Sequence, residues 1–108
     1  MKRGVREALQ EAAGAIYIAA AAVNEDRPEL SRRMTEYTAG LTELCQNATD
    51  ADLLTDYERV EIAEALGAVW AINNLPIQGV KIGEYYNILT QVLAEDEADR
   101  EAQEDAEQ

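Results

Sequence analysis

The sequence predicts an all-α protein, a compact four-helix bundle, and three observations support this fold class. Apolar residues recur at steps of three and four along several long segments, which is the spacing of one face of an α-helix. Residues that typically begin helices precede two of these segments. A third segment, residues 60–77, is nearly free of charge, and a helix that is apolar on most of its surface belongs inside a domain.

That apolar segment predicts the central helix of the bundle, over residues 56–74. No charged residue lies between Ala65 and Gln78, and the segment holds Trp70, the only Trp of the chain. We therefore expect Trp70 to be the largest side chain of the core.

The first helix is predicted over residues 5–23. Its second half is apolar on nearly all sides, so we expect it to be buried on more than one side or covered by a partner. The residues that share its apolar stripe are Val5, Leu9, Ala12 or Ala13, Ile16, Ala20 and Val23.

A second helix is predicted to begin at Asp26. Asp26 serves as the capping residue, Pro28 lies in the first turn and Glu29 follows at the third position. The acidic residues Glu29, Glu36 and Glu43 repeat every seven positions on its outer side. The apolar residues follow a 4-3-4-3-4 spacing that predicts a packing seam, either within the chain or with a second copy: Leu30, Met34, Tyr37, Leu41, Leu44 and Ala48.

The segment after this helix, residues 47–55, is predicted as a break with a short extra helical turn at 50–54. Thr55 and Glu58 form a second capping box, which predicts the start of the central helix. Pro76 ends that helix at residues 73–74, because it disfavours helical geometry in the residue before it. Residues 75–83 are expected to fold back over the core as a loop.

The fourth helix is predicted from Gly83, and the folded domain is expected to span residues 1–94. Residues 95–108 form an acidic C-terminal tail with eight acidic residues against Arg100 alone, a net charge of −7. This tail is expected to be a helical extension or disordered, with fraying from Ala98, because its charges repel one another.

Composition argues for protein binding and against direct binding of nucleic acid. The net charge is −13, from 22 acidic and 9 basic residues. Such a chain repels phosphate and attracts basic partners, although solubility or adaptation to high salt explains the same composition. With one Cys, no signal peptide and no membrane-spanning segment, the chain is expected to be cytoplasmic.

Chemistry-bearing motifs are sparse, so we expect no enzyme, no cofactor and no metal site. The chain has no His, and Cys45 is expected to be a small buried hydrophobic residue. Asp50, Asp52 and Asp56 bracket a loop, but Leu54 and Thr55 stand where a calcium loop needs an oxygen donor and a Gly. Helix capping explains these residues without a metal.

The acidic residues instead suggest an interaction surface. If carboxylates of the second and third helices align, they form an array that fits a groove built for phosphate. The sequence thus suggests a nucleic-acid-mimicking inhibitor of a basic nucleic-acid-handling protein, of the phage or mobile-element type. The alternative is a structural or adaptor subunit that self-associates, for example as a homodimer. The residues expected to bind the partner are Glu29, Glu36, Glu43, Asp50, Asp52, Asp56, Glu58 and Glu61, with Tyr85 or Tyr86 as an exposed apolar anchor.

Overall fold

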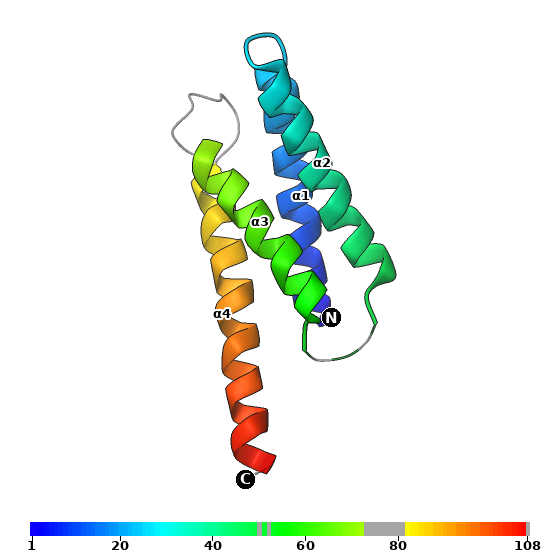
Figure 1. Cartoon of the computed structure of the whole chain (residues 1–108), viewed down its shortest axis with the longest axis vertical. Helices are drawn as coiled ribbons and strands as arrows, with labels where there is room; N and C mark the ends of the chain where they lie inside the picture. The colour runs from blue at the N-terminus through cyan, green and yellow to red at the C-terminus, as the bar shows by residue number, and fades with distance from the viewer. Residues whose placement is uncertain (50, 52, 73–81, 108) are drawn as a thin grey trace.

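The computed structural model describes residues 1–49, 51, 53–72 and 82–107, and within these ranges the chain consists of helices and connections without strands. The predicted four-helix bundle is confirmed, with helices that pack on one another around one apolar core (Figure 1). The helices are α1 (Arg3–Val23), α2 (Pro28–Asn47), α3 (Asp56–Ile72) and α4 (Ile82–Glu107).

Helices α1 and α2 form an antiparallel hairpin and share the most extensive contact of the bundle. Small side chains on α1 let the backbones approach, so hydroxyl groups of α2 reach carbonyl oxygens of α1. Ser31 Oγ donates to the Ala20 carbonyl at 2.7 Å, and Thr38 Oγ1 donates to the Ala13 carbonyl at 3.3 Å. The predicted seam of α2 is therefore used within the chain, with Met34, Leu41 and Leu44 buried in the common core.

The start of α2 differs from the prediction by one residue. Pro28 is the first helical residue, as expected, but Arg27 rather than Asp26 precedes it, without a side-chain capping bond. Asp26 lies in the turn that the Arg27 amide closes on the Val23 carbonyl at 2.8 Å. Asp26 is thus one position too early to cap the first free amides of the helix.

The central-helix prediction is wrong in one respect, because Trp70 lies outside the core. Its exposed fraction is 62%, and that of Val60 is 54%. The core face of α3 is formed instead by Ile62, Ala65 and Val69. A helix that is apolar on several sides does not reveal from its sequence which side will be covered, and α3 lies across the bundle with one side open (Figure 1).

Helix α4 packs against α1 and α3 through Leu89 and Val92 and continues to Glu107, past the fraying expected from Ala98. Its C-terminal part projects beyond the other helices, which makes the molecule elongated at 54 × 25 × 19 Å (Figure 1).

Two expectations fall wholly or partly outside the described residues. These are the end of the third helix with the loop that follows it, and the extra helical turn at 50–54, where Ala51, Leu53 and Leu54 are not helical. Among the helices described, none is both long and apolar enough to cross a membrane.

Candidate functional site

Helices α2 and α3 approach each other closely at Gly40, and acidic residues stand on both helices near this crossing. The crossing lies at Gly40, since a methyl carbon placed there would be 3.3 Å from Oε2 of Glu61. Glu36 and Glu43 stand four residues before and three residues after Gly40, so they share this side of α2. Both are exposed, and so is Glu64, one turn after Glu61. We call Glu36, Glu43, Glu61 and Glu64 the α2–α3 acidic face.

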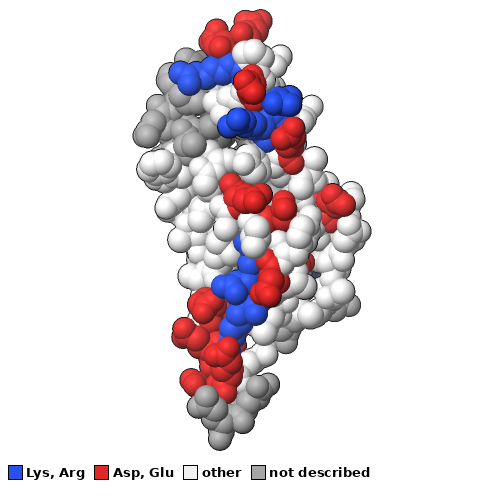
Figure 2. Space-filling view, viewed as in Figure 1, with Lys and Arg blue, Asp and Glu red and all other residues white. Residues whose placement is uncertain are grey.

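The N-terminal part of α2 is electrostatically different, because basic residues accompany its acids. Glu29 is exposed as predicted, but it pairs with Arg32 at 3.3 Å. Figure 2 shows blue and red groups mixed at the end of the molecule that holds the α1–α2 turn, and red groups alone near the middle of this view. The acidic face therefore begins at Glu36, near the middle of α2, and includes the part of α3 beside the C-terminal half of α2.

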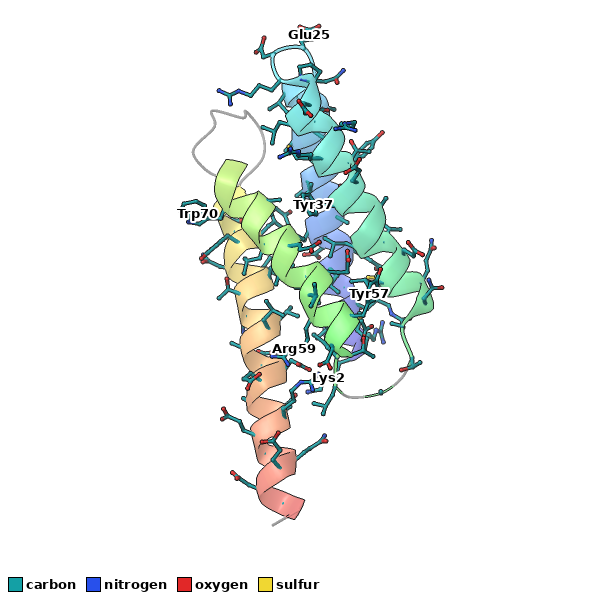
Figure 3. The ribbon with its side chains drawn as sticks, viewed as in Figure 1. Lys2, Glu25, Tyr37, Tyr57, Arg59 and Trp70 are labelled. Carbon is teal, nitrogen blue, oxygen red and sulfur yellow. The ribbon has the colours of Figure 1, made fainter. Side chains whose placement is uncertain are left out.

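A pocket of about 170 Å³ lies beside this face, between the end of α2 and the start of α3. Tyr57 stands at its edge with 65% of its surface exposed, and Figure 3 shows it on the α2 side of α3. Tyr57, Glu61 and Glu64 are spaced at four and three residues, so they lie on one side of α3. This spacing is visible in the sequence, although Tyr57 is not among the residues predicted to bind a partner. The pocket is lined by Glu43, Leu44, Asn47, Ala48, Thr49, Thr55, Tyr57 and Glu58.

Glu58 has a structural role at the edge of this pocket. It is 8% exposed, and its Oε1 accepts from the Thr55 amide at 2.8 Å, while the Glu58 amide donates to Thr55 Oγ1 at 3.1 Å. The predicted capping box is thus confirmed, and it occupies the Glu58 carboxylate that was expected to meet a partner. Asp56 is exposed but borders a different hollow with Val60 and Ala63, while Asp50 and Asp52 lie outside the described residues.

The two tyrosines proposed as anchors lie at the other end of the α3–α4 pair. Tyr85 and Tyr86 are both half-buried and pack against the core cluster. Tyr57 has the larger exposed surface and stands next to the acidic face, which makes it the better placed aromatic side chain.

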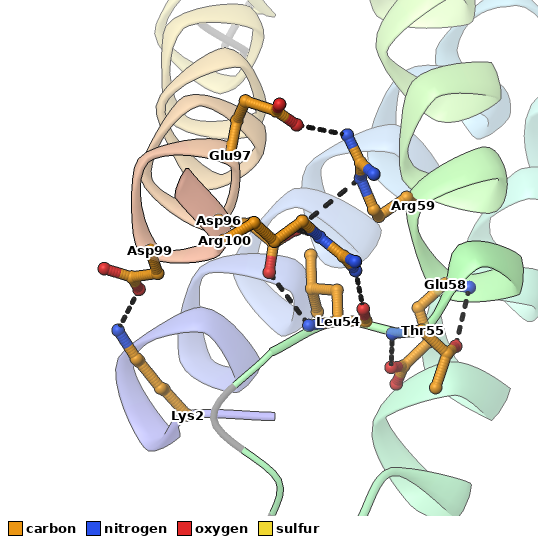
Figure 4. A network of polar contacts seen from close by, with 9 residues as sticks. All are labelled: Lys2, Leu54, Thr55, Glu58, Arg59, Asp96, Glu97, Asp99 and Arg100. Carbon is orange, nitrogen blue, oxygen red and sulfur yellow. Dashed lines mark hydrogen bonds and ion pairs between the residues drawn. The ribbon is translucent and has the colours of Figure 1, made fainter. Parts of the chain in front are cut away.

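Three acidic residues of α4, Asp96, Glu97 and Asp99, form a separate cluster that is bound to the rest of the chain (Figure 4). Asp96 is 6% exposed. Its Oδ1 accepts from the Leu54 amide at 2.8 Å, and its Oδ2 accepts from Arg100 Nε at 2.9 Å and lies 3.5 Å from Arg59 Nε. Arg100 also donates to the Leu54 carbonyl, so Asp96 and Arg100 together hold both backbone groups of Leu54.

Further ion pairs extend this cluster to α1 and α3. Arg59 Nη2 donates to Glu97 Oε2 at 2.7 Å, and Lys2 pairs with Asp99. The hydrogen bond from Arg100 to Asp96 raises the pKa of the guanidinium above its ordinary value, which keeps this cation charged. We call Asp96, Glu97, Asp99 and Arg100 the α4 anchor. In the sequence, the four-residue spacing of Asp96 and Arg100 indicates one ion pair of this anchor.

Cys45, the one thiol of the chain, is buried as expected. Burial raises the pKa of the Cys45 thiol; the charge of Arg6, which the fold brings close, opposes this shift, and Glu58 adds to it. A thiol held protonated is a poor nucleophile. Among the described residues, no group of three or more His, Cys, Asp or Glu side chains is placed to hold a metal ion.

No protein-family model, curated protein or solved structure matches the chain. Four-helix bundles serve many unrelated functions, so the fold alone does not indicate a role. The functional argument therefore depends on the surface chemistry of the α2–α3 acidic face and its pocket.

Proposed function

We propose that the chain is a non-enzymatic binding protein whose α2–α3 acidic face engages a basic surface of another protein. The observation that carries this proposal is that Glu61 lies against Gly40 at the α2–α3 crossing, with Glu36, Glu43 and Glu64 exposed within two turns of it on the two helices. Two packed helices hold the backbone of these residues in place, so little order has to be gained when a partner binds.

Arginine side chains suit this face best as the partner's contacts. A guanidinium pairs with carboxylates through two parallel hydrogen bonds and also stacks on aromatic rings. Tyr57, exposed beside Glu43 at the pocket, supplies such a ring. An arginine that enters the pocket would thus meet a carboxylate and an aromatic face together.

A nucleic-acid-handling protein is the kind of partner that offers such arginines in a groove. Glu36 and Glu43 are two helical turns apart, about 10 Å along α2, and Glu61 extends the array onto α3. Proteins hold nucleic-acid backbones with arginine and lysine side chains, which bind carboxylates equally well. The face would then act as a decoy for part of that groove. The net charge of −13 would speed the encounter through long-range attraction.

The test is binding of a nona-arginine peptide to charge-reversed variants. The Glu36→Lys/Glu43→Lys variant should bind at least about tenfold more weakly than the wild type, because each contact with a charged group contributes about 1.5–3 kcal/mol. The matched control is Glu101→Lys/Glu104→Lys on the exposed end of α4, which changes the net charge by the same amount. An equal loss of affinity in both variants would mean that binding depends only on net charge, and it would overturn the proposal.

A further inference from the structure

Helix α3 carries a second surface next to the acidic face, and this surface is mainly apolar, with the exposed Glu64 at the border between the two. Val60, Ala63, Gly67 and Trp70 are all exposed and follow a 3-4-3 spacing, so they form one stripe along the helix. Within the described part of the chain, nothing lies within 4 Å of a methyl carbon placed on Gly67, and Gly67 itself is exposed. We call these four residues the α3 outer face.

The α3 outer face holds a hollow and a protruding side chain. A hollow of about 410 Å³ is lined by Val60, Ala63 and Leu93, with Asp56 and Arg59 at its border. Trp70 lies seven residues after Ala63, two helical turns or about 10 Å further along the same side. Figure 3 shows Trp70 projecting from α3 away from Tyr57, and its exposed fraction is 62%.

We propose that the α3 outer face binds a second copy of this chain, with the two α3 helices antiparallel about a two-fold axis. An axis midway between Ala63 and Trp70 passes near Gly67, the residue without a side chain, where the two helices approach most closely. The same operation places each Trp70 over the hollow of the other copy. A surface that carries both the protruding Trp70 and the hollow that receives it is self-complementary, which a two-fold interface requires.

Charge also favours a second copy at this face. Two chains of net charge −13 repel each other over most of their surfaces. From Ala65 to Trp70 the helix has no charged residue, and around Val60 and Ala63 the charged neighbours are Asp56 and Glu64, with Arg59 of opposite charge. Two copies therefore approach with least repulsion here, and screening by salt should strengthen the dimer.

The size of the face predicts a weak dimer. From Val60 to Trp70 it is about 15 Å long and one helix diameter, about 10 Å, wide. Such a contact falls below the roughly 1,200 Å² of total buried surface typical of stable complexes. We expect association in the upper micromolar range and a dissociation constant that falls between about 0.05 and 1 M salt.

Trp70 is the only Trp of the chain, so its fluorescence emission reports on the α3 outer face. The fluorescence emission of the wild type should shift to shorter wavelength between about 1 µM and 1 mM protein, while sedimentation velocity detects a dimer over the same range. The Trp70→Ala variant should raise the dissociation constant at least about tenfold, and Ala63→Glu should do the same by placing a charge in the hollow. Tyr17→Ala, which removes an aromatic ring of 59% exposure from α1, is the matched control and should leave it unchanged.

Circular dichroism of each variant shows whether the helices are retained, so a loss of association is read only from folded variants. A wild type that stays monomeric up to the highest concentration would overturn the proposal. A Trp70→Ala variant that associates like the wild type would overturn it as well. A blue shift that appears only with phosphatidylcholine vesicles, without a dimer, would assign the face to a lipid surface and also contradict the second copy.

Discussion

Two acidic regions of this molecule carry similar side chains but have different surroundings. On α4, Asp96 is buried with two arginines and a backbone amide, and Glu97 and Asp99 pair with Arg59 and Lys2. On the α2–α3 acidic face, Glu36, Glu43 and Glu64 are exposed to solvent at the helix crossing. The first region connects helices within the chain, whereas the second is open to solvent.

The comparison shows that local charge density does not indicate which carboxylates are available. The α4 tail has the higher density of acidic residues, and the negative C-terminal end of the helix dipole repels their charges. It is nevertheless helical, and Arg59 and Lys2, which pair with it, come from α3 and the chain start, far away in sequence. The acids of α2 and α3 are sparser, yet Glu36, Glu43 and Glu64 stay exposed near the crossing of the two helices.

The largest expected effect comes from removing the centre of the α4 anchor. Asp96→Ala should lower the free energy of unfolding by about 2–4 kcal/mol, because it removes the acceptor of the Leu54 amide and the carboxylate that pairs with Arg100 and Arg59. Arg59 and Arg100 keep some contact with water, so the loss should stay below that of a fully buried pair. Urea denaturation followed by circular dichroism measures it. Glu101→Ala, five residues further along the exposed part of α4, should change stability by less than about 0.5 kcal/mol, and an equal loss in both variants would contradict a specific anchor.

A smaller effect on stability is expected at the start of α3, where the Glu58 carboxylate caps its own helix. Thr55→Ala removes one half of the capping box and should lower the free energy of unfolding by about 1 kcal/mol. Thr42→Ala is the control, because Thr42 is exposed and its hydroxyl bonds to the Thr38 carbonyl within its own helix. The same urea titration should show no comparable loss for the control, and a larger loss there than at Thr55 would argue against the box.

The smallest effect on stability should come from the acidic face itself. The Glu36→Gln/Glu43→Gln variant should unfold within about 0.5 kcal/mol of the wild type, with any change favouring the folded state, because neighbouring carboxylates repel one another. A loss greater than about 1 kcal/mol would mean that these residues stabilise the bundle. They would then belong with Asp96 rather than with a binding surface.

The fold and most helix bounds follow from the sequence because they depend on local spacing and capping. The start of α3 was predicted to the residue because Thr55 and Glu58 bond to each other across one turn. The position of Trp70 could not be predicted, since α3 is apolar on several sides and only its neighbours decide which side is covered. The burial of Asp96 depends on Leu54 and Arg59, whose proximity is a property of the tertiary structure.

The candidate site was predicted in part for the same reason. Glu36 and Glu43 were identified from their seven-residue repeat, and Glu61 from its place on the next helix. Their convergence depends on the crossing at Gly40, and Glu58 left the set because its carboxylate caps its own helix. Tyr57 replaces Tyr85 and Tyr86 as the exposed ring, because the latter two pack against the core.

The most direct test of the account is to map where an arginine-rich peptide binds. Amide chemical shifts of the ¹⁵N-labelled chain would be followed while nona-arginine is added at low salt. The account predicts the largest changes in residues 36–48 and 55–64, around the acidic face and the Tyr57 pocket. Changes concentrated in residues 97–107 would show that the peptide follows charge density along α4, and would contradict the claim that the helix crossing creates the binding surface.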